Sequence, residues 1–379
     1  MLNMDAENPS PGPISPDTPR KRRRPWLLRW LSSVFWLLVV ALLFRWLVLE
    51  AFVISSASME GTLEAGDWIL VSKWSYGPRS PSALSVPFAH QKIGQTKWPA
   101  YFSLEKWGIS VGRWRFGRVR YHDVLVFNDP AERQHPIEHR TPFVKRCVGL
   151  PGDTLEIRQA RVYANRQLLP APQKRLFRYF LQARKPINPA FFARFDIRYD
   201  PIKRKGKEWH YTAYATPEAA QSFKILQKVG LVKGFARQEQ AAEVLDSTLY
   251  PQTGRQTGNA DHYGPVVVPQ RGMKIPLSAN NLAWYGPLIL NFELGPQQKA
   301  EIRDETLYLN GQVLREYTFQ QDYYFVLGDH YHASWDSRYW GFVPDSHLIG
   351  KVWLIWLSLD KSKKWGQGKI RWHRLGWVR

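Results

Sequence analysis

The chain is poor in cysteine and in acidic residues, and it contains only one long hydrophobic run. Cys147 is the single cysteine, which excludes an internal disulfide and a cysteine-rich zinc site. A lone cysteine is more often a small buried apolar residue than a nucleophile. After Leu49 no hydrophobic segment reaches the length of about 20 residues that a membrane-spanning helix needs. The run from Val352 to Leu357 is too short to cross a membrane and indicates a buried strand.

Acidic side chains are scarce relative to basic ones. The 379 residues include 53 lysines and arginines but only 32 aspartates and glutamates, which gives a formal net charge of +21. No nucleic-acid-binding fold is recognisable and the charge is spread along the chain, so nucleic acid is not an expected partner. Attraction to anionic lipid head groups fits the charge better. The length allows two domains, and the hydrophobic share of 44% allows a sizeable core.

The N-terminal region is typical of a basic tail followed by a membrane anchor. Residues 1–25 are rich in proline and polar residues and contain the basic run Arg20–Arg24, which predicts a disordered cytoplasmic tail. Residues 26–49 are nearly all apolar and predict a transmembrane helix. Arg29 and Arg45 lie near its ends, where arginine side chains can reach the head groups. The basic run predicts that the N-terminus stays inside and that the rest of the chain lies outside.

A cleaved signal peptide is the alternative interpretation of the same segment. The basic run, the apolar stretch and the small residues Ser55-Ser56-Ala57 follow one another in the order of such a peptide. The uncharged stretch ends at Phe44, and the small residues lie too far beyond it for an ordinary cleavage region. We therefore favour the anchor.

The remainder of the chain indicates a mainly β domain. Asp67–Val71 and Asp123–Phe127 are compact apolar runs bounded by turn residues, which predicts strands. Thr154–Arg158 and Leu307–Leu309 alternate in polarity. Glu156–Arg158 leads to Val162–Asn165 and Glu301–Arg303 leads to Leu307–Asn310, which predicts two similar hairpins. Asn310-Gly311 is a strong hairpin turn signal. The aromatic share of 14% also favours β-structure.

The middle of the chain differs from its flanks and predicts a small mixed α/β insertion at residues 158–300. Within it, Thr216 and Pro217 form a helix start, which predicts a helix to about Gly230. The β domain is thereby divided into a first part, residues 50–157, and a second part, residues 301–379.

Two local sequences carry the chemistry. Ser58 follows the end of the apolar stretch, and Lys145 lies in an apolar run before the turn residues Gly149, Pro151 and Gly152. A serine hydroxyl is a poor nucleophile until a base takes its proton. A lysine can be that base when burial makes its amine neutral near pH 7, and Met59, Val144 and Val148 are apolar neighbours that favour burial. Either segment alone is common in proteins.

A third segment, Gly328 to Pro344, completes a pattern. The three segments, in this order behind an apolar span, resemble the bacterial type I signal peptidases (leader peptidases, peptidase family S26). That family has a serine box S-x-S-M-x-P-T-L, a lysine box K-R-x-x-G-x-P-G-D and a late box G-D-N-R-x-N-S-x-D-S-R. The resemblance covers roughly residues 27–157 and 296–360. The segment Tyr263–Pro269 looks like the longer versions found in Bacteroidetes-type bacteria.

The resemblance implies a fold and an activity. The expected fold is an all-β signal-peptidase-type catalytic domain that carries the α/β insertion behind one N-terminal transmembrane helix. The expected activity is that of a membrane-anchored serine endopeptidase, which removes signal peptides from exported preproteins at the outer face of the bacterial plasma membrane. No metal and no organic cofactor is implied.

The resemblance also assigns roles to residues. Ser58 is the expected nucleophile and Lys145 the expected general base. The Ser58 N–H and the Ser56 hydroxyl match the donors to the oxyanion, and Ser334 matches the serine that holds the lysine amine. The remaining matched residues form a supporting ion pair, Asp336 and Arg338.

The boxes depart from the family pattern at several positions. Ser55 stands where the family has a Pro before the first box serine, Ala57 stands where it has a Gly between the two serines, and Gly61 replaces the Pro after Met. In the late box, His330, Tyr331 and Ala333 replace Asn, Arg and Asn. The altered late box leaves two other chemistries open. One is a metal site that uses Asp329 with the two histidines, and the other is a Ser-His-Asp triad that uses His330 or His332, which leaves Lys145 without a role.

Two further functions remain as alternatives. One is a non-catalytic basic envelope protein that binds lipid or polyanions, supported by the departures in the late box. The other is a Ser/Lys peptidase with a narrow client, such as a pilin-processing enzyme.

Overall fold

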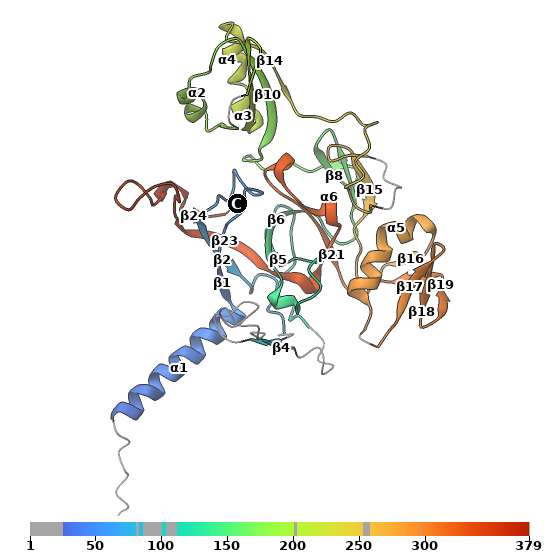
Figure 1. Cartoon of the computed structure of the whole chain (residues 1–379). Coiled ribbons are helices and arrows are strands. Elements are labelled where there is room, and N and C mark those ends of the chain that lie inside the picture. Colours follow the sequence, from blue (N-terminus) through green and yellow to red (C-terminus); the bar gives the residue numbers. More distant parts are fainter. Residues whose placement is uncertain are drawn as a thin grey trace, which may run out of the picture. The chain divides into compact units, whose positions relative to one another are not determined.

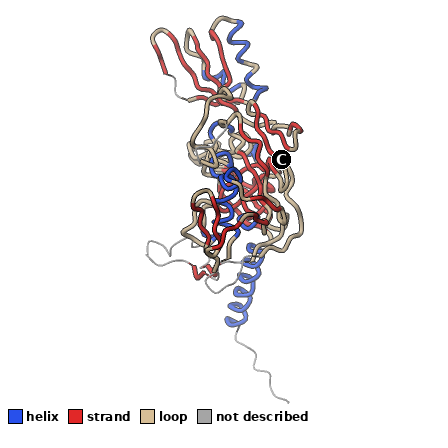
Figure 2. Tube along the Cα trace, turned by 90° about the vertical axis from the view of Figure 1, so that its right-hand side faces the viewer, coloured by secondary structure: helices blue, strands red, loops and turns tan. Residues whose placement is uncertain are grey.

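The computed structural model describes residues 26–80, 83–85, 101–103, 112–200, 203–252, 258–295 and 297–378. The predicted disordered tail, residues 1–25, lies outside these ranges. The chain divides into two units after Phe44. Strands predominate in the second unit (Figure 2), so the predicted mainly β fold is confirmed.

The first helix, α1, spans Trp26–Leu47 (Figure 1). Its 22 residues correspond to about 33 Å of helix, close to the thickness of a bilayer's hydrocarbon core. The segment Arg29–Leu47 is long and apolar enough to cross a membrane. None of the described side chains of the helix is buried. The helix ends two residues before the predicted end because strand β1 begins at Leu49.

An eight-stranded antiparallel sheet is the centre of the second unit (Figure 1). Its strands lie in the order β1–β2–β23–β5–β6–β21–β22, and β24 pairs with β23. The bounds are β1 Leu49–Val53, β2 Asp67–Ser72, β5 Val124–Asn128, β6 Pro142–Gly149, β21 Tyr323–Leu327, β22 Val343–Pro344, β23 Leu348–Ser358 and β24 Gly376–Trp377. The strands predicted at 67–71, 123–127 and 352–357 are confirmed as β2, β5 and part of β23.

Both faces of this sheet are covered at β5, as the alternation of its side chains between two clusters shows. Val124 and Val126 belong to one hydrophobic cluster, and Leu125 and Phe127 belong to another. Successive side chains of a strand point to opposite faces, so a strand buried on both sides is apolar throughout. Cys147 lies in the second cluster as a fully buried residue.

The two predicted hairpins are confirmed in smaller sheets. One sheet has the order β15–β7–β8–β9 and another the order β17–β18–β19. The bounds are β7 Thr154–Arg158, β8 Arg161–Ala164, β9 Gln167–Leu168, β15 Tyr263–Val267, β17 Ala300–Arg303, β18 Thr306–Leu309 and β19 Gln312–Leu314. Asn310 and Gly311 form the β18–β19 turn with φ values of 52° and 81°, as a two-residue hairpin turn requires.

The middle of the chain contains a mixed α/β module. Its sheet has the order β11–β13–β10–β14, with β12 paired to β13. The bounds are β10 Phe177–Ala183, α2 Pro189–Arg194, β11 Arg198–Tyr199, β12 Lys203–Lys205, β13 Glu208–Ala215, α3 Pro217–Ala220, α4 Phe223–Lys228 and β14 Val232–Arg237. The predicted helix start is confirmed, because the Thr216 side chain accepts a hydrogen bond from Ala219 N–H. The predicted single helix is wrong: Gln221 and Ser222 separate α3 from α4, and the Ser222 hydroxyl bonds the Ala219 carbonyl.

Short elements complete the described part of the chain. They are β3 Ala83–Ser85 paired with β4 Tyr101–Ser103, β16 Lys274–Pro276 paired with β20 Glu316–Thr318, α5 Ala279–Leu288, η3 Ile289–Glu293, η2 Ile137–His139, η4 Tyr331–Ala333, α6 Ser337–Trp340, η5 Asp345–His347 and η6 Trp372–Arg374. The late-box segment, Gly328 to Pro344, begins directly after β21, which pairs with β6, and it runs through η4 and α6 into β22.

Candidate active site

Ser58 lies in a tightly folded loop between β1 and β2, here named the serine loop (residues 54–66). Leu63 N–H donates to the Met59 carbonyl at 2.8 Å, and both side chains are almost fully buried in the core. Gly61 has a φ of 93°, a conformation that side-chain-bearing residues rarely adopt. The buried anchors and the turn fix the backbone that carries Ser58.

Lys145 comes from β6, which pairs with β5 on one side and β21 on the other. A hydrogen bond of 2.6 Å joins Lys145 Nζ to Ser58 Oγ across 87 positions of sequence. Lys145 is 5% exposed and Ser58 is 9% exposed. The fold therefore brings the two predicted catalytic residues into direct contact and removes both from bulk water.

The surroundings of Lys145 make its amine easier to deprotonate. Burial lowers the pKa of Lys145 from 10.5 to about 8, against the opposing attraction of the Asp336 and Asp329 carboxylates. The positive charge of Arg338 adds to the lowering. With that pKa about one amine in ten is neutral at pH 7, compared with fewer than about one in a thousand for a free lysine.

Two polar groups beside the Ser58 hydroxyl are of the kind that donates to an oxyanion. Ser56 Oγ lies 3.4 Å from Ser58 Oγ and is exposed. Within the described part of the chain, the Ser58 N–H donates to no acceptor. A free backbone N–H and a nearby hydroxyl are the kinds of group that stabilise a tetrahedral intermediate.

The late box packs directly on the serine loop. His330 N–H donates to the Ser58 carbonyl at 3.1 Å. A Cβ on Gly328 would lie 2.5 Å from the Ser58 carbonyl oxygen and 2.2 Å from Ser334 Oγ, so this position accommodates only glycine. Ser334 is buried, and its hydroxyl has no hydrogen-bond partner among the described residues. The predicted contact of Ser334 with the lysine amine is thus not formed as a hydrogen bond here, although Ser334 lies beside the loop.

Asp336 and Arg338 form a fully buried ion pair within the late box. Arg338 Nε lies 2.9 Å from Asp336 Oδ1, and both side chains are 0% exposed. Asp336 also accepts from Gly328 N–H at 3.1 Å, and Arg338 donates to the Tyr331 carbonyl at 2.7 Å. The guanidinium lies 4.2 Å from the centroid of the Tyr331 ring, so Tyr331, a departure from the family pattern, packs on the ion pair. The pair shapes the turn that brings Gly328 to Ser58.

The rings of the two late-box histidines lie against groups other than the Ser58 hydroxyl. His332 Nε2 lies 3.2 Å from Asp261 Oδ1, and its Nδ1 accepts from Arg178 N–H at 3.4 Å. His330 Nδ1 lies 3.3 Å from a carboxylate oxygen of Glu60. Neither contact includes a serine hydroxyl, so the geometry favours the Ser/Lys pair over a Ser-His-Asp triad. Among the described residues no three side chains of His, Cys, Asp or Glu gather as a metal site would require.

The sequence interpretation missed a second buried ion pair beside the candidate dyad. Arg146 Nη2 lies 2.7 Å from Asp329 Oδ2, with side chains 2% and 0% exposed. Arg146 also donates to the His122 carbonyl at 2.8 Å and to Thr62 Oγ1 at 3.1 Å. The available signals were the arginine next to Lys145 in an apolar strand and the aspartate after Gly328. A charge at such a position needs a buried partner.

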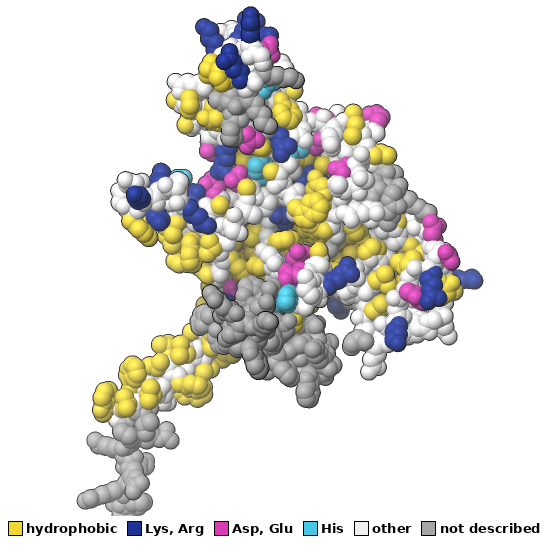
Figure 3. Space-filling model, viewed as in Figure 1, with side chains coloured by type: hydrophobic (Ala, Val, Ile, Leu, Met, Phe, Trp, Pro, Cys, Tyr) yellow, Lys and Arg dark blue, Asp and Glu magenta, His cyan; other side chains and the backbone are white. Residues whose placement is uncertain are grey.

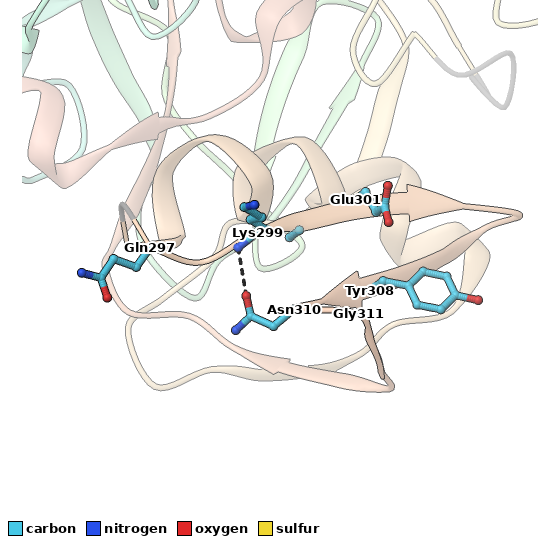
Figure 4. A pocket seen from close by; sticks show the side chains of 7 residues that line it. Gln297, Lys299, Glu301, Tyr308, Asn310 and Gly311 are labelled. Atoms are coloured by element: carbon cyan, nitrogen blue, oxygen red, sulfur yellow. Dashed lines mark hydrogen bonds between the residues drawn. The ribbon is translucent and has the colours of Figure 1, made fainter.

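A hollow elsewhere in the molecule is not part of this site. It has a volume of about 470 Å³ and is open to solvent beside β17 and β18. Figure 4 shows its lining residues, Gln297, Lys299, Ala300, Glu301, Tyr308, Asn310 and Gly311. Lys299 N–H donates to Asn310 Oδ1 at 3.0 Å, which closes one end of the β17–β18 pair. None of these lining residues is a serine, threonine or cysteine, so the site beside Ser58 is the better candidate.

This chain is similar to the members of a known protein family. The family model described as signal peptidase, peptidase S26, matches residues 27–193 and 313–357. The protein named Signal peptidase I of Buchnera aphidicola subsp. Acyrthosiphon pisum is 26% identical over 365 residues, which cover 94% of this chain and 83% of the relative. Signal peptidase I of Haemophilus influenzae is 24% identical, covering 89% and 72%. Signal peptidase I of Pseudomonas aeruginosa is 23% identical, covering 90% and 76%.

Proposed function

Because this chain belongs to the signal peptidase family, peptidase S26, and is a serine endopeptidase, we propose that it removes signal peptides from exported preproteins with a Ser58/Lys145 dyad. The observation that carries the proposal is the buried 2.6 Å contact between Lys145 Nζ and Ser58 Oγ. A lysine held against a serine away from water is what an activated serine nucleophile requires.

The proposed reaction proceeds in two stages. Neutral Lys145 takes the Ser58 proton while Oγ attacks the scissile carbonyl carbon, and the same amine then protonates the leaving nitrogen as the C–N bond breaks. The Ser58 acyl ester remains. Water attacks that ester after losing a proton to Lys145, and the proton returns to Ser58 Oγ as the ester bond breaks.

The neighbouring residues support both stages in this proposal. The Ser58 N–H and the Ser56 hydroxyl donate to the oxyanion. Ser334 orients the lysine amine once Ser58 Oγ has moved to the substrate, which would give its buried hydroxyl a partner. Asp336 and Arg338 hold the late box in place and take no part in proton transfer. None of these steps needs a metal or an organic cofactor.

The cleavage rate should depend on the ionisation of Lys145. The neutral amine is the active form, and its pKa is lowered to about 8. We expect kcat/KM to fall about tenfold per pH unit below that value and to reach a plateau about one unit above it. Rates measured between pH 6 and 10 test this. A rate limb near the free histidine value of about 6.5 that disappears in His330→Ala or His332→Ala would instead assign the base to a histidine.

We propose that α1 anchors the enzyme in the bacterial plasma membrane as a single span. Hydrophobic side chains cover the face of α1 that Figure 3 shows. The charged residues Arg29 and Arg45 lie near the ends of the helix. Exposed tryptophans on the second unit, among them Trp356 and Trp377 of β23 and β24, suit an interface with lipid. The net charge of +21 favours anionic head groups as the lipid partner.

The orientation of this anchor should leave the N-terminus inside. The motivation is the run Arg20–Arg24 before the helix, with no matching basic cluster directly after Leu49. Protease added outside intact cells that lack an outer barrier should digest the second unit and spare an epitope tag placed before Met1. Digestion of the tag would reverse the topology and remove the proposed access to exported substrates.

Cleavage of a preprotein by the purified full chain in detergent tests the function itself. The expected result is one mature product whose new N-terminus follows a small residue, and no product from Ser58→Ala. A non-catalytic envelope protein would yield no product from either protein. A panel of unrelated preproteins separates the proposed broad enzyme from a narrow-client peptidase, which would cut one of them.

A further inference from the structure

The α/β module adjoins the loop that carries the candidate nucleophile. We define the insertion module as residues 174–237, which include β10 to β14. The Lys174 carbonyl oxygen would lie 2.1 Å from a Cβ on Gly61, so the backbone of the module touches the serine loop there. Leu176 pairs with His330, the residue that bonds the Ser58 carbonyl. The module is thus next to both segments that hold Ser58.

Arg198, at the start of β11 in this module, bridges two carboxylates of the serine loop. Its Nη1 lies 2.7 Å from Glu60 Oε1, and its Nη2 lies 2.7 Å from Glu64 Oε1. The fixed fork of a guanidinium suits such a double contact better than a lysine amine does. The two ion pairs therefore span the turn that directly follows Ser58.

The two carboxylates differ in how much they depend on Arg198. Glu64 also lies 2.9 Å from Arg371 and 2.8 Å from Arg374, so it keeps two guanidinium partners if Arg198 is removed. In the described part of the chain, Arg198 is the one guanidinium that contacts Glu60. Glu60 is therefore the point at which the module acts on the loop.

Glu60 is charged, and its other neighbour is tied to Ser58. Burial alone would raise the pKa of Glu60, but His330 and Arg198 outweigh burial and lower the pKa below its usual value. His330 lies 3.3 Å from Glu60 through its ring and 3.1 Å from the Ser58 carbonyl through its N–H. Its ring also packs edge-on against Tyr214 of the module, with centroids 4.7 Å apart. Glu60 thus contacts His330, and His330 in turn donates a hydrogen bond to the backbone carbonyl of Ser58.

We propose that Arg198 is a positioning residue for the cleavage reaction. By holding Glu60, it fixes the turn after Ser58 and with it the directions of Ser58 Oγ and the Ser58 N–H. The expected effect on the cleavage rate rests on the proposed function. The expected effect on the structure of the serine loop rests only on the contacts of Arg198 and Glu60. It gives the insertion module a role in catalysis without placing any of its residues on the substrate.

The expected effect on rate exceeds the expected effect on folding. Arg198 is one-third exposed, and partly exposed ion pairs contribute little to folding. The cleavage rate is more sensitive to the loss of Arg198 than the folding stability is, because a small displacement of a reacting group removes much of the rate gained from its correct orientation. Loss of Arg198 should therefore leave the protein folded and slow the chemical step.

Three single variants of the full chain in detergent measure this step. Arg198→Ala should lower kcat about three- to tenfold while KM and the pH of the rate limb stay unchanged. Arg198→Lys should recover part of the loss, since it keeps the charge but not the double contact. Arg194→Ala is the matched control, because Arg194 is exposed in the same module and rests on the Phe195 ring. It should behave as the unaltered protein.

A double-mutant cycle tests whether Arg198 acts through Glu60. If it does, Arg198→Ala combined with Glu60→Gln should be no slower than the slower single variant. Fully additive losses would contradict the proposed route.

Hydrogen exchange of the serine loop tests the proposal without any cleavage assay. The N–H groups of Glu60, Thr62 and Leu63 donate to carbonyls within the loop. Their exchange should be faster in Arg198→Ala than in the unaltered protein or in Arg194→Ala. Unchanged exchange in Arg198→Ala would overturn the inference. If the unaltered protein cleaved no preprotein, the proposed function would fail, and the exchange rates would still decide whether Arg198 holds the loop.

Discussion

Ser58→Ala and Lys145→Ala are each expected to abolish preprotein cleavage. Ser58 Oγ is the proposed attacking atom, and Lys145, 2.6 Å away, is the proposed base. Residues that act as one unit lose nearly everything when either is removed, so we expect a loss of ~10⁴-fold or more from each single variant. The double variant should be no worse than either single one. Product formation by quantitative mass spectrometry measures these losses.

The folding stability of a further variant, Lys145→Met, tests whether loss of activity at the dyad is separate from loss of folding. Folding forces Lys145 into surroundings that lower its pKa from 10.5 to about 8, so the folded state disfavours the charged amine. Below about pH 8 this cost is fully present, and it disappears as the pH rises toward the unfolded value. Lys145→Met should thus be inactive yet more stable at pH 7, by up to ~3 kcal/mol. Near-normal cleavage by Lys145→Met would exclude the dyad.

Asp336→Asn is expected to cause the largest loss of stability among substitutions near the site. The variant removes the charge that balances Arg338, and both side chains are 0% exposed. Removing one partner of a buried ion pair leaves an uncompensated charge, which costs ~3–5 kcal/mol. The free energy of unfolding, measured with urea and tryptophan fluorescence on the full chain in detergent, should fall by this amount. Cleavage should fall as well, because Asp336 holds the Gly328 N–H beside Ser58.

Glu156→Gln is the matched control for the buried pair. Glu156 pairs with Arg158, whose side chain is 60% exposed, on a hairpin outside the late box. Exposed pairs contribute about 0–1 kcal/mol, so this variant should be nearly as stable as the unaltered protein. Equal stabilities of Asp336→Asn and Glu156→Gln would mean that the buried pair does not support the late box.

The correct sequence predictions concern features whose causes lie within a few residues. Thr216 and Pro217 start a helix because a side-chain oxygen and a fixed φ act on the adjacent turn. Asn310-Gly311 forms a hairpin turn because both residues tolerate positive φ. The helix predicted after Thr216 ended early for a reason that the sequence pattern did not show, the bond from Ser222 back to the Ala219 carbonyl.

The candidate site was predictable only in part. The resemblance to the family boxes identified Ser58 and Lys145 as a catalytic pair. The apolar residues around each of them did not indicate that the two residues lie together. Nothing in the local sequence paired Arg146 with Asp329, which are 183 positions apart, or His332 with Asp261, which are 71 positions apart. A charged residue in an apolar strand indicates that a partner exists, and the fold decides which residue it is.

The sequence by itself determined the apolar span, the strand pattern, the turns and the three boxes, because these depend on side-chain type and short-range periodicity. The tertiary structure alone decided the distance between Ser58 and Lys145 and the pKa of the amine. Both depend on how β6, the serine loop and the late box pack together and exclude water, since desolvation acts only on a group that the whole fold has buried. The contact of Arg198 with Glu60 is of the same kind, because it exists only once the insertion module has folded against the serine loop.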